Sequence, residues 1–372
     1  HPLAGGPIVI VVAKIGTSSI TAADGTVDTA AVEKFCSEAA ALRGLGHRVV
    51  LVTSGAIAAG LPALGYAHGE RPRDAVTLQA ASAVGQTRLM RVYENALGAH
   101  GMVSGQVLLA PLDFMVRQQY LHARATLGRL LDLGVVPVVN ENDAIADDEI
   151  RFGDNDRLAA LVAHLVHADL LVLLTDTPGL FTADPRLDDA ASLIEEIVEV
   201  DHALEQAAGG PTTVQGSGGM ASKLAAAKIA SWSGVRAVIA KADRPGVLAG
   251  ALAGEPGVGT VVRPHDRRLS ARKLWIAFAV GASGTIVVDD GARAALTERG
   301  SSLLPAGVIG VEGSFAAEDA VEIAGADGRV FAKGLAAHAA ARVKEWQGKR
   351  TGDLPPDATH EVVHRDDLVV LP

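Results

Sequence analysis

The feature that most constrains this fold is a regular alternation of short valine, isoleucine and leucine runs with longer amphipathic stretches, from residue 7 to about residue 265. A short, continuous apolar run is typical of a strand buried on both faces of a parallel sheet. We expect strands at residues 8–13, 48–52, 106–110, 135–140, 170–175 and 236–240. Helical periodicity predicts helices at residues 30–43, 75–98, 118–133, 154–167 and 220–233. Strands and helices that alternate in this way predict an open α/β/α sandwich.

The pattern changes near residue 255, where glycine, proline and then basic residues indicate a linker. Beyond it, short strand patterns separated by turns predict a small β-rich domain that is compatible with a compact barrel. The expected strands lie at residues 284–288, 307–312, 320–323 and 329–333, with a helix at 291–299. We therefore predict a larger domain over residues 7–262, a linker over 263–274 and a smaller domain over 275–368.

Composition limits the cellular setting and the classes of partner. The formal net charge of −10 does not favour binding to nucleic acid through bulk electrostatics. The single cysteine, Cys36, cannot form an internal disulfide, and we expect it to pack in the core of a cytoplasmic protein. Neither a secretory signal nor an apolar run of the ~20 residues needed to span a bilayer is visible, so we expect no membrane segment.

Polar clusters follow the predicted strands, and in open α/β sheets ligands gather at the carboxyl ends of the strands. The clusters lie at residues 14–19, 53–56, 140–143 and 175–176, and a fifth lies in the glycine-rich run at 216–223. Turn chemistry alone explains any one of them, since Gly, Ser, Asn and Asp are common turn residues. Five clusters at strand or helix ends predict one shared crevice.

The run GSGGMASK at residues 216–223 places three glycines and two hydroxyls ahead of Lys223 and opens a predicted helix. Glycines allow backbone N–H groups to approach an anion closely, and a helix N-terminus adds partial positive charge. The alternative is a flexible loop that only caps the helix. The cluster at residues 14–19 also combines a lysine, a glycine and hydroxyls, so we expect both to bind one polyphosphate.

Several motifs, taken in their order along the chain, resemble those of the amino acid kinase family, and within it those of the glutamate 5-kinases with a C-terminal PUA domain. They are VAKIGTS at 12–18, VTSGAI at 52–57, PVVNEND at 137–143, GDND at 153–156, LTD at 174–176, TADPR at 182–186 and GGMASK at 218–223. In the smaller domain they are IVVDDGA at 286–292 and GSSLLP at 300–305. The resemblance covers nearly the whole chain and implies the amino acid kinase fold followed by a PUA-like barrel.

The resemblance implies that ATP phosphorylates the γ-carboxylate of L-glutamate, the first step of proline biosynthesis. A carboxylate is already a nucleophile, so the reaction needs charge neutralisation more than a general base. By their match to the family motifs, Lys14 and Lys223 would clamp the transferring phosphoryl group. Asp156 would orient both lysines. The amino acid would be bound by Asp143, through its α-ammonium group, and by Ser54 and Asn155.

The resemblance also implies the nucleotide site and the metal. The residues that would bind ATP are Lys14, Gly16, Thr17, Thr175, Asp176, Ser217, Gly218, Gly219, Met220, Ala221, Ser222 and Lys223. Mg²⁺ would be held mainly by ATP and water, because the sequence shows no dedicated carboxylate cage.

Other interpretations remain open. A related kinase that acts on aspartate, N-acetylglutamate, carbamate or a nucleoside monophosphate would share the lysines and the glycine loop. PUA domains elsewhere often bind RNA, but residues 275–372 do not form a strongly basic block, and RNA binding is not expected here. The resemblance further implies a homo-oligomer, a dimer or tetramer, and feedback inhibition by proline.

Overall fold

The structure is a computed structural model that describes residues 7–67, 69–145, 155–182, 190–201, 204, 219–266, 268–356 and 359–371. The chain forms two compact units, His1–Arg268 and Leu269–Pro372. The division falls inside the stretch that the sequence marks as a linker. The predicted limits of the two domains themselves stay predictions.

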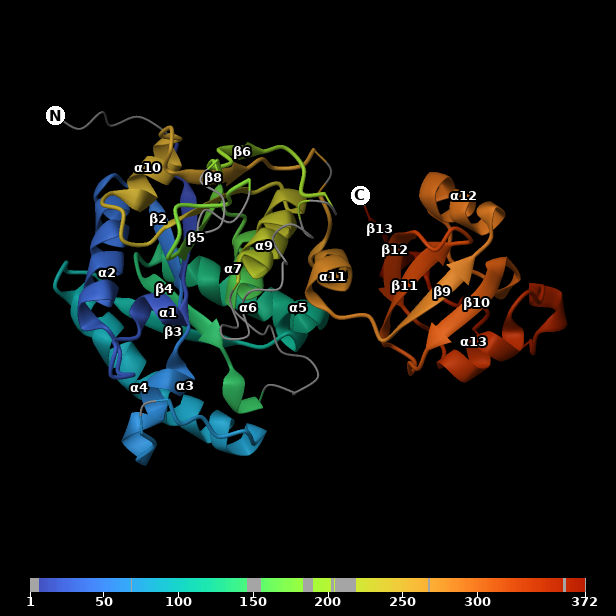
Figure 1. The fold of residues 1–372 in the computed structure, drawn as a ribbon, viewed down its shortest axis with the longest axis horizontal. Coiled ribbons are helices and arrows are strands. Elements are labelled where there is room, and N and C mark those ends of the chain that lie inside the picture. Colours follow the sequence, from blue (N-terminus) through green and yellow to red (C-terminus); the bar gives the residue numbers. More distant parts are fainter. Residues whose placement is uncertain are drawn as a thin grey trace. The chain divides into compact units, whose positions relative to one another are not determined.

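The first unit is built on a mixed sheet of eight strands, and the expected α/β architecture with helices on both faces is confirmed (Figure 1). In spatial order the strands are β3 (Ser104–Leu109), β4 (Val136–Glu141), β2 (Arg48–Val52), β1 (Ile10–Ile15), β5 (Leu170–Thr175), β7 (Arg236–Lys241), β8 (Gly259–Val262) and β6 (Glu196–Ile197). β1 lies near the middle, paired in parallel with β2 on one side and β5 on the other. This arrangement brings the carboxyl ends of β1, β2, β4 and β5 to one edge of the sheet.

β8 is a strand that the sequence pattern did not predict, although it lies within the predicted larger domain. Gly259–Val262 is a strand that pairs antiparallel with β7 and parallel with β6. The sequence pattern missed it because four residues next to a Pro-Gly turn are too few to show periodicity. The buried Thr260 hydroxyl accepts a hydrogen bond from the backbone N–H of Leu180 at 2.8 Å, so the strand also fixes the chain after β5.

Helices cover the two faces of this sheet (Figure 1). On one face, α2 (Thr29–Gly44), α4 (Ala75–Gly98) and α10 (Val247–Ala253) enclose an apolar core with alternate residues of the strands. On the other face lie α7 (Asn155–Leu165) and α9 (Met220–Trp232). α6 (Arg117–Asp132) packs near β4, and the short helices are α1 (Thr17–Ile20), α3 (Ala56–Gly60) and α5 (Leu112–Met115).

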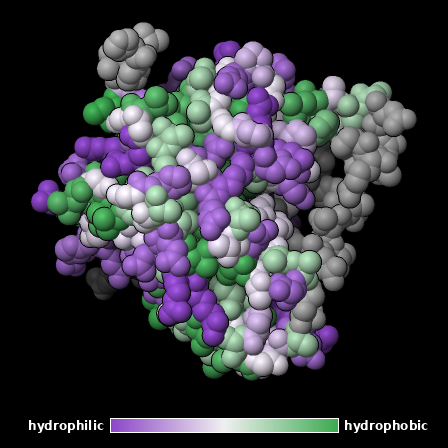
Figure 2. All heavy atoms as spheres, turned by 90° about the vertical axis from the view of Figure 1, so that its left-hand side faces the viewer, coloured by the Kyte–Doolittle hydropathy of each residue, from purple (hydrophilic) through white to green (hydrophobic). Residues whose placement is uncertain are grey.

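The core beneath α2 contains Cys36, as expected. Burial, with a smaller contribution from the charge of Glu33, raises the pKa of the Cys36 thiol to about 12. The outer side of this face mixes hydrophilic residues with smaller apolar areas (Figure 2). Among the described helices, none combines the length and the apolar character needed to cross a bilayer.

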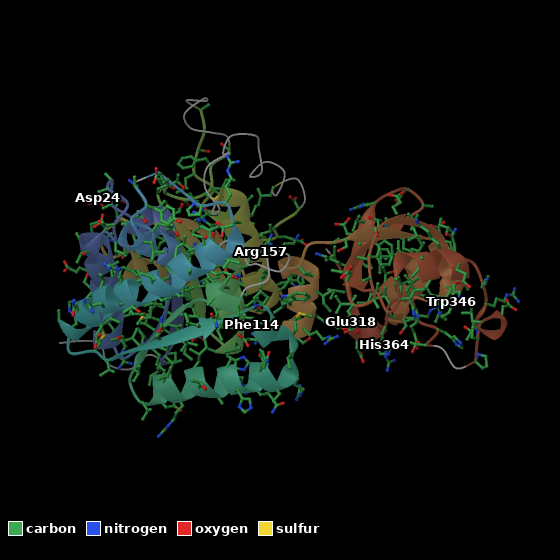
Figure 3. The ribbon with its side chains drawn as sticks, turned by 90° about the horizontal axis from the view of Figure 1, so that it is seen from below. Asp24, Phe114, Arg157, Glu318, Trp346 and His364 are labelled. Atoms are coloured by element: carbon green, nitrogen blue, oxygen red, sulfur yellow. The ribbon has the colours of Figure 1, made fainter. Side chains whose placement is uncertain are left out.

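The second unit is the predicted β-rich domain. Its five strands run in the order β10 (Val308–Gly313), β9 (Gly284–Val288), β11 (Ala320–Gly325), β12 (Val330–Leu335) and β13 (Leu368–Val370). The helices are α11 (Ala271–Leu274), α12 (Asp290–Arg299) and α13 (Ala340–Trp346), with a π-helical segment at Trp275–Ala279. The unit has an apolar core of its own, into which Val343 of α13 packs. Trp346, labelled in Figure 3, is also buried and has the guanidinium of Arg342 over its ring.

Candidate active site

The alternation of β1 decides where Lys14 points. Successive side chains of a strand face opposite sides of the sheet. Val11, Ala13 and Ile15 belong to the core beneath α2, α4 and α10. Lys14 therefore faces α7 and α9, and these helices bury it, so that it is only 2% exposed.

Asp156, in the first turn of α7, lies between the two lysines that the sequence singles out. Its Oδ1 is 2.6 Å from Nζ of Lys14, and its Oδ2 accepts a hydrogen bond from Nζ of Lys223 at 3.1 Å. The Ser222 hydroxyl donates to the same Oδ2 at 3.3 Å. Arg157, the next residue of α7, is labelled in Figure 3. The structure thus brings together three segments that are far apart in the sequence.

Lys14, Asp156 and Lys223 are all buried, which strengthens the electrostatic interactions between them. Asp156 is 0% exposed and Lys223 is 4% exposed, and buried charges are costly unless they are paired and hydrogen-bonded. Two ammonium groups share one carboxylate here, so the three side chains together carry an excess of positive charge. Such a fixed, dry, cationic group is suited to an anion that gains charge during a reaction.

Glycine leaves the space beside the Lys14 ammonium group open. A Cβ built on Gly16 would lie 3.5 Å from Nζ of Lys14, so any longer side chain at this position would crowd the ammonium group. Gly219 is the N-cap of α9, and within the described residues no side chain caps the helix there. Met220 and Ala221 lie in the first turn of α9, where backbone N–H groups lack intrahelical acceptors. Ser217 and Gly218 lie outside the described residues.

Ser54 lies next to the first loop. The hydroxyl of Thr17 donates to Oγ of Ser54 at 3.0 Å, and Oγ of Ser54 donates weakly to the carbonyl of Ile15 at 3.4 Å. Gly55 follows in the left-handed conformation, with φ of 89°, and turns the chain from β2 into α3. A residue expected to bind the nucleotide and one expected to bind the amino acid are therefore in direct contact.

Asn155 takes part in a buried polar network behind Ser54. Its Nδ2 donates to the carbonyl of Thr53 and to Oδ1 of Asn140, each at 2.6 Å. The hydroxyl of Tyr93, on α4, donates to Oγ1 of Thr53 at 2.8 Å. Burial raises the pKa of Tyr93 above its usual range, so this hydroxyl keeps its proton and donates at neutral pH. The network fixes the ends of β2 and β4 relative to α7.

Asp143 begins a short 3₁₀ helix of one turn, Asp143–Ile145, shortly after β4. Its Oδ2 accepts a hydrogen bond from the hydroxyl of Ser82, on α4, at 2.7 Å. Asn140 belongs to the same polar cluster, and its Oδ1 accepts hydrogen bonds from the backbone N–H of Glu141 and from Nδ2 of Asn155. The buried Nδ2 of Asn140 has no hydrogen-bond acceptor within the described residues. An unsatisfied buried donor is costly, so this nitrogen is suited to a ligand oxygen.

Thr175 and Asp176 end β5 and contact each other, with Oγ1 of Thr175 donating to Oδ1 of Asp176 at 3.0 Å. They line a cavity of about 500 Å³ that also borders on Ser18 and Ser19 of α1 and on the first turns of α2. Lys14, Asp156 and Lys223 are not among its lining residues. Because β1 and β5 run parallel, Thr175 and Asp176 lie at the same edge of the sheet as Lys14, and the cavity that they line is the described space nearest to them.

Sequence reasoning missed several residues of this site. Thr53 and Asn140 lie in polar clusters that the sequence pointed out, but neither was assigned a role. Ser82 and Tyr93 lie inside a long helix, where nothing in the local pattern separates them from other helix residues. In the described parts of the chain, no group of three or more His, Cys, Asp or Glu side chains is placed to hold a metal ion.

Comparisons with known proteins identify the family of this chain. The amino acid kinase family profile matches residues 9–241, and the PUA domain profile matches residues 284–354. The chain is 49% identical over 365 residues to the glutamate 5-kinase of Frankia casuarinae, covering 97% of this chain and 96% of that protein. It is 44% identical over 365 residues to the glutamate 5-kinase of Pelobacter propionicus, covering 97% of each. It is 45% identical over 364 residues to the glutamate 5-kinase of Burkholderia multivorans, again covering 97% of each. The chain therefore belongs to the amino acid kinase family and, within it, to the glutamate 5-kinases that carry a PUA domain.

Proposed function

We propose that this protein transfers the γ-phosphoryl group of ATP to the side-chain carboxylate of L-glutamate, as the first step of proline biosynthesis. The observation that carries the proposal is the buried contact of Lys14 and Lys223 with the single carboxylate of Asp156. The identity to glutamate 5-kinases over nearly the whole chain supports glutamate as the acceptor.

In the proposed reaction an oxygen of the glutamate side chain attacks the γ-phosphorus of ATP. The bond from that phosphorus to the bridging β–γ oxygen breaks, and ADP leaves with the electron pair. No proton needs to move, because the nucleophile is already ionised. Nζ of Lys14 and Nζ of Lys223 neutralise the phosphoryl oxygens, and Asp156 holds both nitrogens in place.

The remaining residues would divide between the two substrates. Gly16, Thr17 and residues 217–222 would contact the phosphates, and Thr175 and Asp176 would lie beside the nucleotide. Ser54, Asp143 and Asn155 would bind glutamate, with the carboxylate of Asp143 on the α-ammonium group. We add Asn140 to this group because its buried Nδ2 has no acceptor within the described residues.

Mg²⁺ would be held mainly by ATP and water, since the described residues contain no group of three or more His, Cys, Asp or Glu side chains placed to bind it. The carboxylate of Asp156 is occupied by two ammonium groups. Bound with ATP, Mg²⁺ would supply charge neutralisation at the phosphates beside Lys14 and Lys223. Homo-oligomerisation and inhibition by proline belong to the same proposal, and sedimentation and assays with added proline measure them.

The experiment that tests the proposal is an ATP turnover assay with hydroxylamine, which traps an acyl phosphate as a hydroxamate. The acceptors are glutamate, aspartate, N-acetylglutamate, carbamate and UMP, and the variants are Lys223→Ala and, as a control on the same helix, Lys228→Ala. We expect hydroxamate from glutamate, lost in Lys223→Ala and kept in Lys228→Ala. Turnover of another acceptor but not glutamate would overturn the substrate assignment, and activity in Lys223→Ala would overturn the role of that lysine.

A further inference from the structure

Ser82 lies inside α4, in its third turn, and is only 1% exposed. Serine inside a helix often bonds to the backbone of its own helix. Here its hydroxyl donates instead to Oδ2 of Asp143 at 2.7 Å. A short hydrogen bond to an ionised carboxylate is among the stronger kinds in proteins.

Asp143 needs such a partner. It begins a three-residue 3₁₀ turn, and such short turns have poor hydrogen-bond geometry of their own. The direction of its carboxylate therefore depends on tertiary contacts, and α4 is packed against this turn. The long helix α4 therefore holds the Asp143 carboxylate in a direction that the short turn could not fix by itself.

The same helix also supports the segment that carries Ser54. α3 begins directly after Ser54 and Gly55, and it crosses α4 with backbones in contact. A Cβ on Gly85 of α4 would lie 1.6 Å from the carbonyl oxygen of Ala56. A Cβ on Gly60 of α3 would lie 1.8 Å from the carbonyl oxygen of Ala81, the residue before Ser82.

We infer that α4 sets the separation between Ser54 and Asp143, and that Ser82 is a positioning residue that holds the Asp143 carboxylate for the acceptor's α-ammonium group. The inference rests on the proposed function, since it assumes that these two side chains bind the acceptor. Ser82 does not touch the substrate and acts through Asp143. A fixed separation between the two groups selects for the length of the acceptor.

The test is the Ser82→Ala variant of the full chain, assayed with glutamate and ATP as varied substrates. Alanine is a good helix former, so the variant is expected to fold, and its melting temperature is measured alongside. A hydrogen bond to a charged group contributes enough to predict a rise of about tenfold in KM for glutamate. KM for ATP should stay within about twofold of wild type, because the phosphate-binding residues are untouched. Selectivity for glutamate over aspartate and 2-aminoadipate, one methylene shorter and longer, should fall.

The control is Ser231→Ala. This buried serine also lies in a helix, α9, and its hydroxyl donates to the backbone carbonyl of Arg263 at 2.7 Å, away from the acceptor-binding residues. It removes the same hydroxyl and should leave KM for glutamate unchanged. Equal changes in both variants would indicate a general loss of packing and overturn the inference.

A second measurement separates the route through Asp143 from loosening of the whole acceptor site. Glutarate has both carboxylates of glutamate but lacks the α-ammonium group, so its inhibition constant should not change in Ser82→Ala. A parallel weakening of glutarate and glutamate would overturn the inference, as would an unchanged KM for glutamate. Wild-type protein without glutamate turnover would instead overturn the proposed function itself.

Discussion

Asp156 pairs with both lysines of the site, so its charge matters for stability as well as for turnover. Replacing it by asparagine removes the charge and keeps the shape. We expect Asp156→Asn to lose turnover and to lose about 3–5 kcal/mol of unfolding free energy, because two ammonium groups would remain buried without their carboxylate. Urea unfolding and the hydroxamate assay measure the two effects.

The matched control is Asp132→Asn. Asp132 pairs with Arg48 at 3.0 Å, but Asp132 is exposed and Arg48 is only half-buried, and such pairs near the surface contribute less than about 1 kcal/mol. Asp132→Asn should be close to wild type in both assays. An Asp156→Asn variant as stable as this control would contradict the buried ion pairs.

His164, in the last turn of α7, predicts a pH dependence of stability. Burial, and then the charges of His167 and Arg124, lower its pKa from 6.5 to about 4. Between these values the unfolded chain binds the proton more readily than the folded protein does. Stability therefore falls as the pH decreases from 6.5 towards 4, by up to about 3 kcal/mol from this residue.

The His164→Gln variant should lose this part of the pH dependence in urea unfolding at pH 7, 6, 5 and 4.5. His100→Gln, which changes an exposed histidine, should leave the wild-type slope. An unchanged slope in His164→Gln would show that other groups cause the acid sensitivity.

At the scale of elements, the close crossing of α3 and α4 fixes the position of Ser54 relative to α4. Gly85 lies where the two backbones touch, whereas a Cβ on Gly98, at the end of the same helix, would meet nothing within 4 Å. We expect Gly85→Ala to destabilise the protein strongly and to weaken glutamate turnover, since the helices must move apart. Gly98→Ala should be neutral or stabilising by up to about 1 kcal/mol, because alanine favours helix. Thermal unfolding compares them, and equal melting temperatures would contradict the close crossing.

Elements themselves were largely predictable. The expected bounds of β2, β5, β9 and α4 agree with the structure, and other strands shift by one or two residues. These elements are long or strongly apolar, so their periodicity is clear. β6, β8 and β13 were missed because they are short, and a short strand is stabilised mainly by its pairing with neighbouring strands.

At the scale of the whole molecule, the first unit contains every described residue of the candidate site and has an apolar core of its own. We expect a chain ending at residue 268 to fold and to keep glutamate-dependent turnover within a few fold of the full chain. A chain ending at residue 258 would lose β8, the strand that pairs with β7, and should not fold. Circular dichroism and the hydroxamate assay separate the two, and loss of turnover in a folded 268-residue chain would give the second unit a direct role.

The sequence by itself determined the alternation of strands and helices, the β-rich second unit and the polar clusters that follow the strands. These features are local, since they depend on periodicity and on turn residues over a few positions. The family motifs pointed to both lysines and to Asp156 for the same reason: each motif is a short run of residues. Ser54, Asp143 and Asn155 were found in the same way.

Only the tertiary structure decided which of these groups meet. Lys14 reaches Asp156, which also binds Lys223, because β1 turns the Lys14 side chain towards α7 and α9. Strand order and the handedness of the crossovers together set which helices cover that face. Ser82 and Tyr93 join the site because α4 packs beside β2 and β4, which no pattern within α4 records. Contacts between segments far apart in the sequence depend on how all the strands and helices pack together, which no local pattern of residues records.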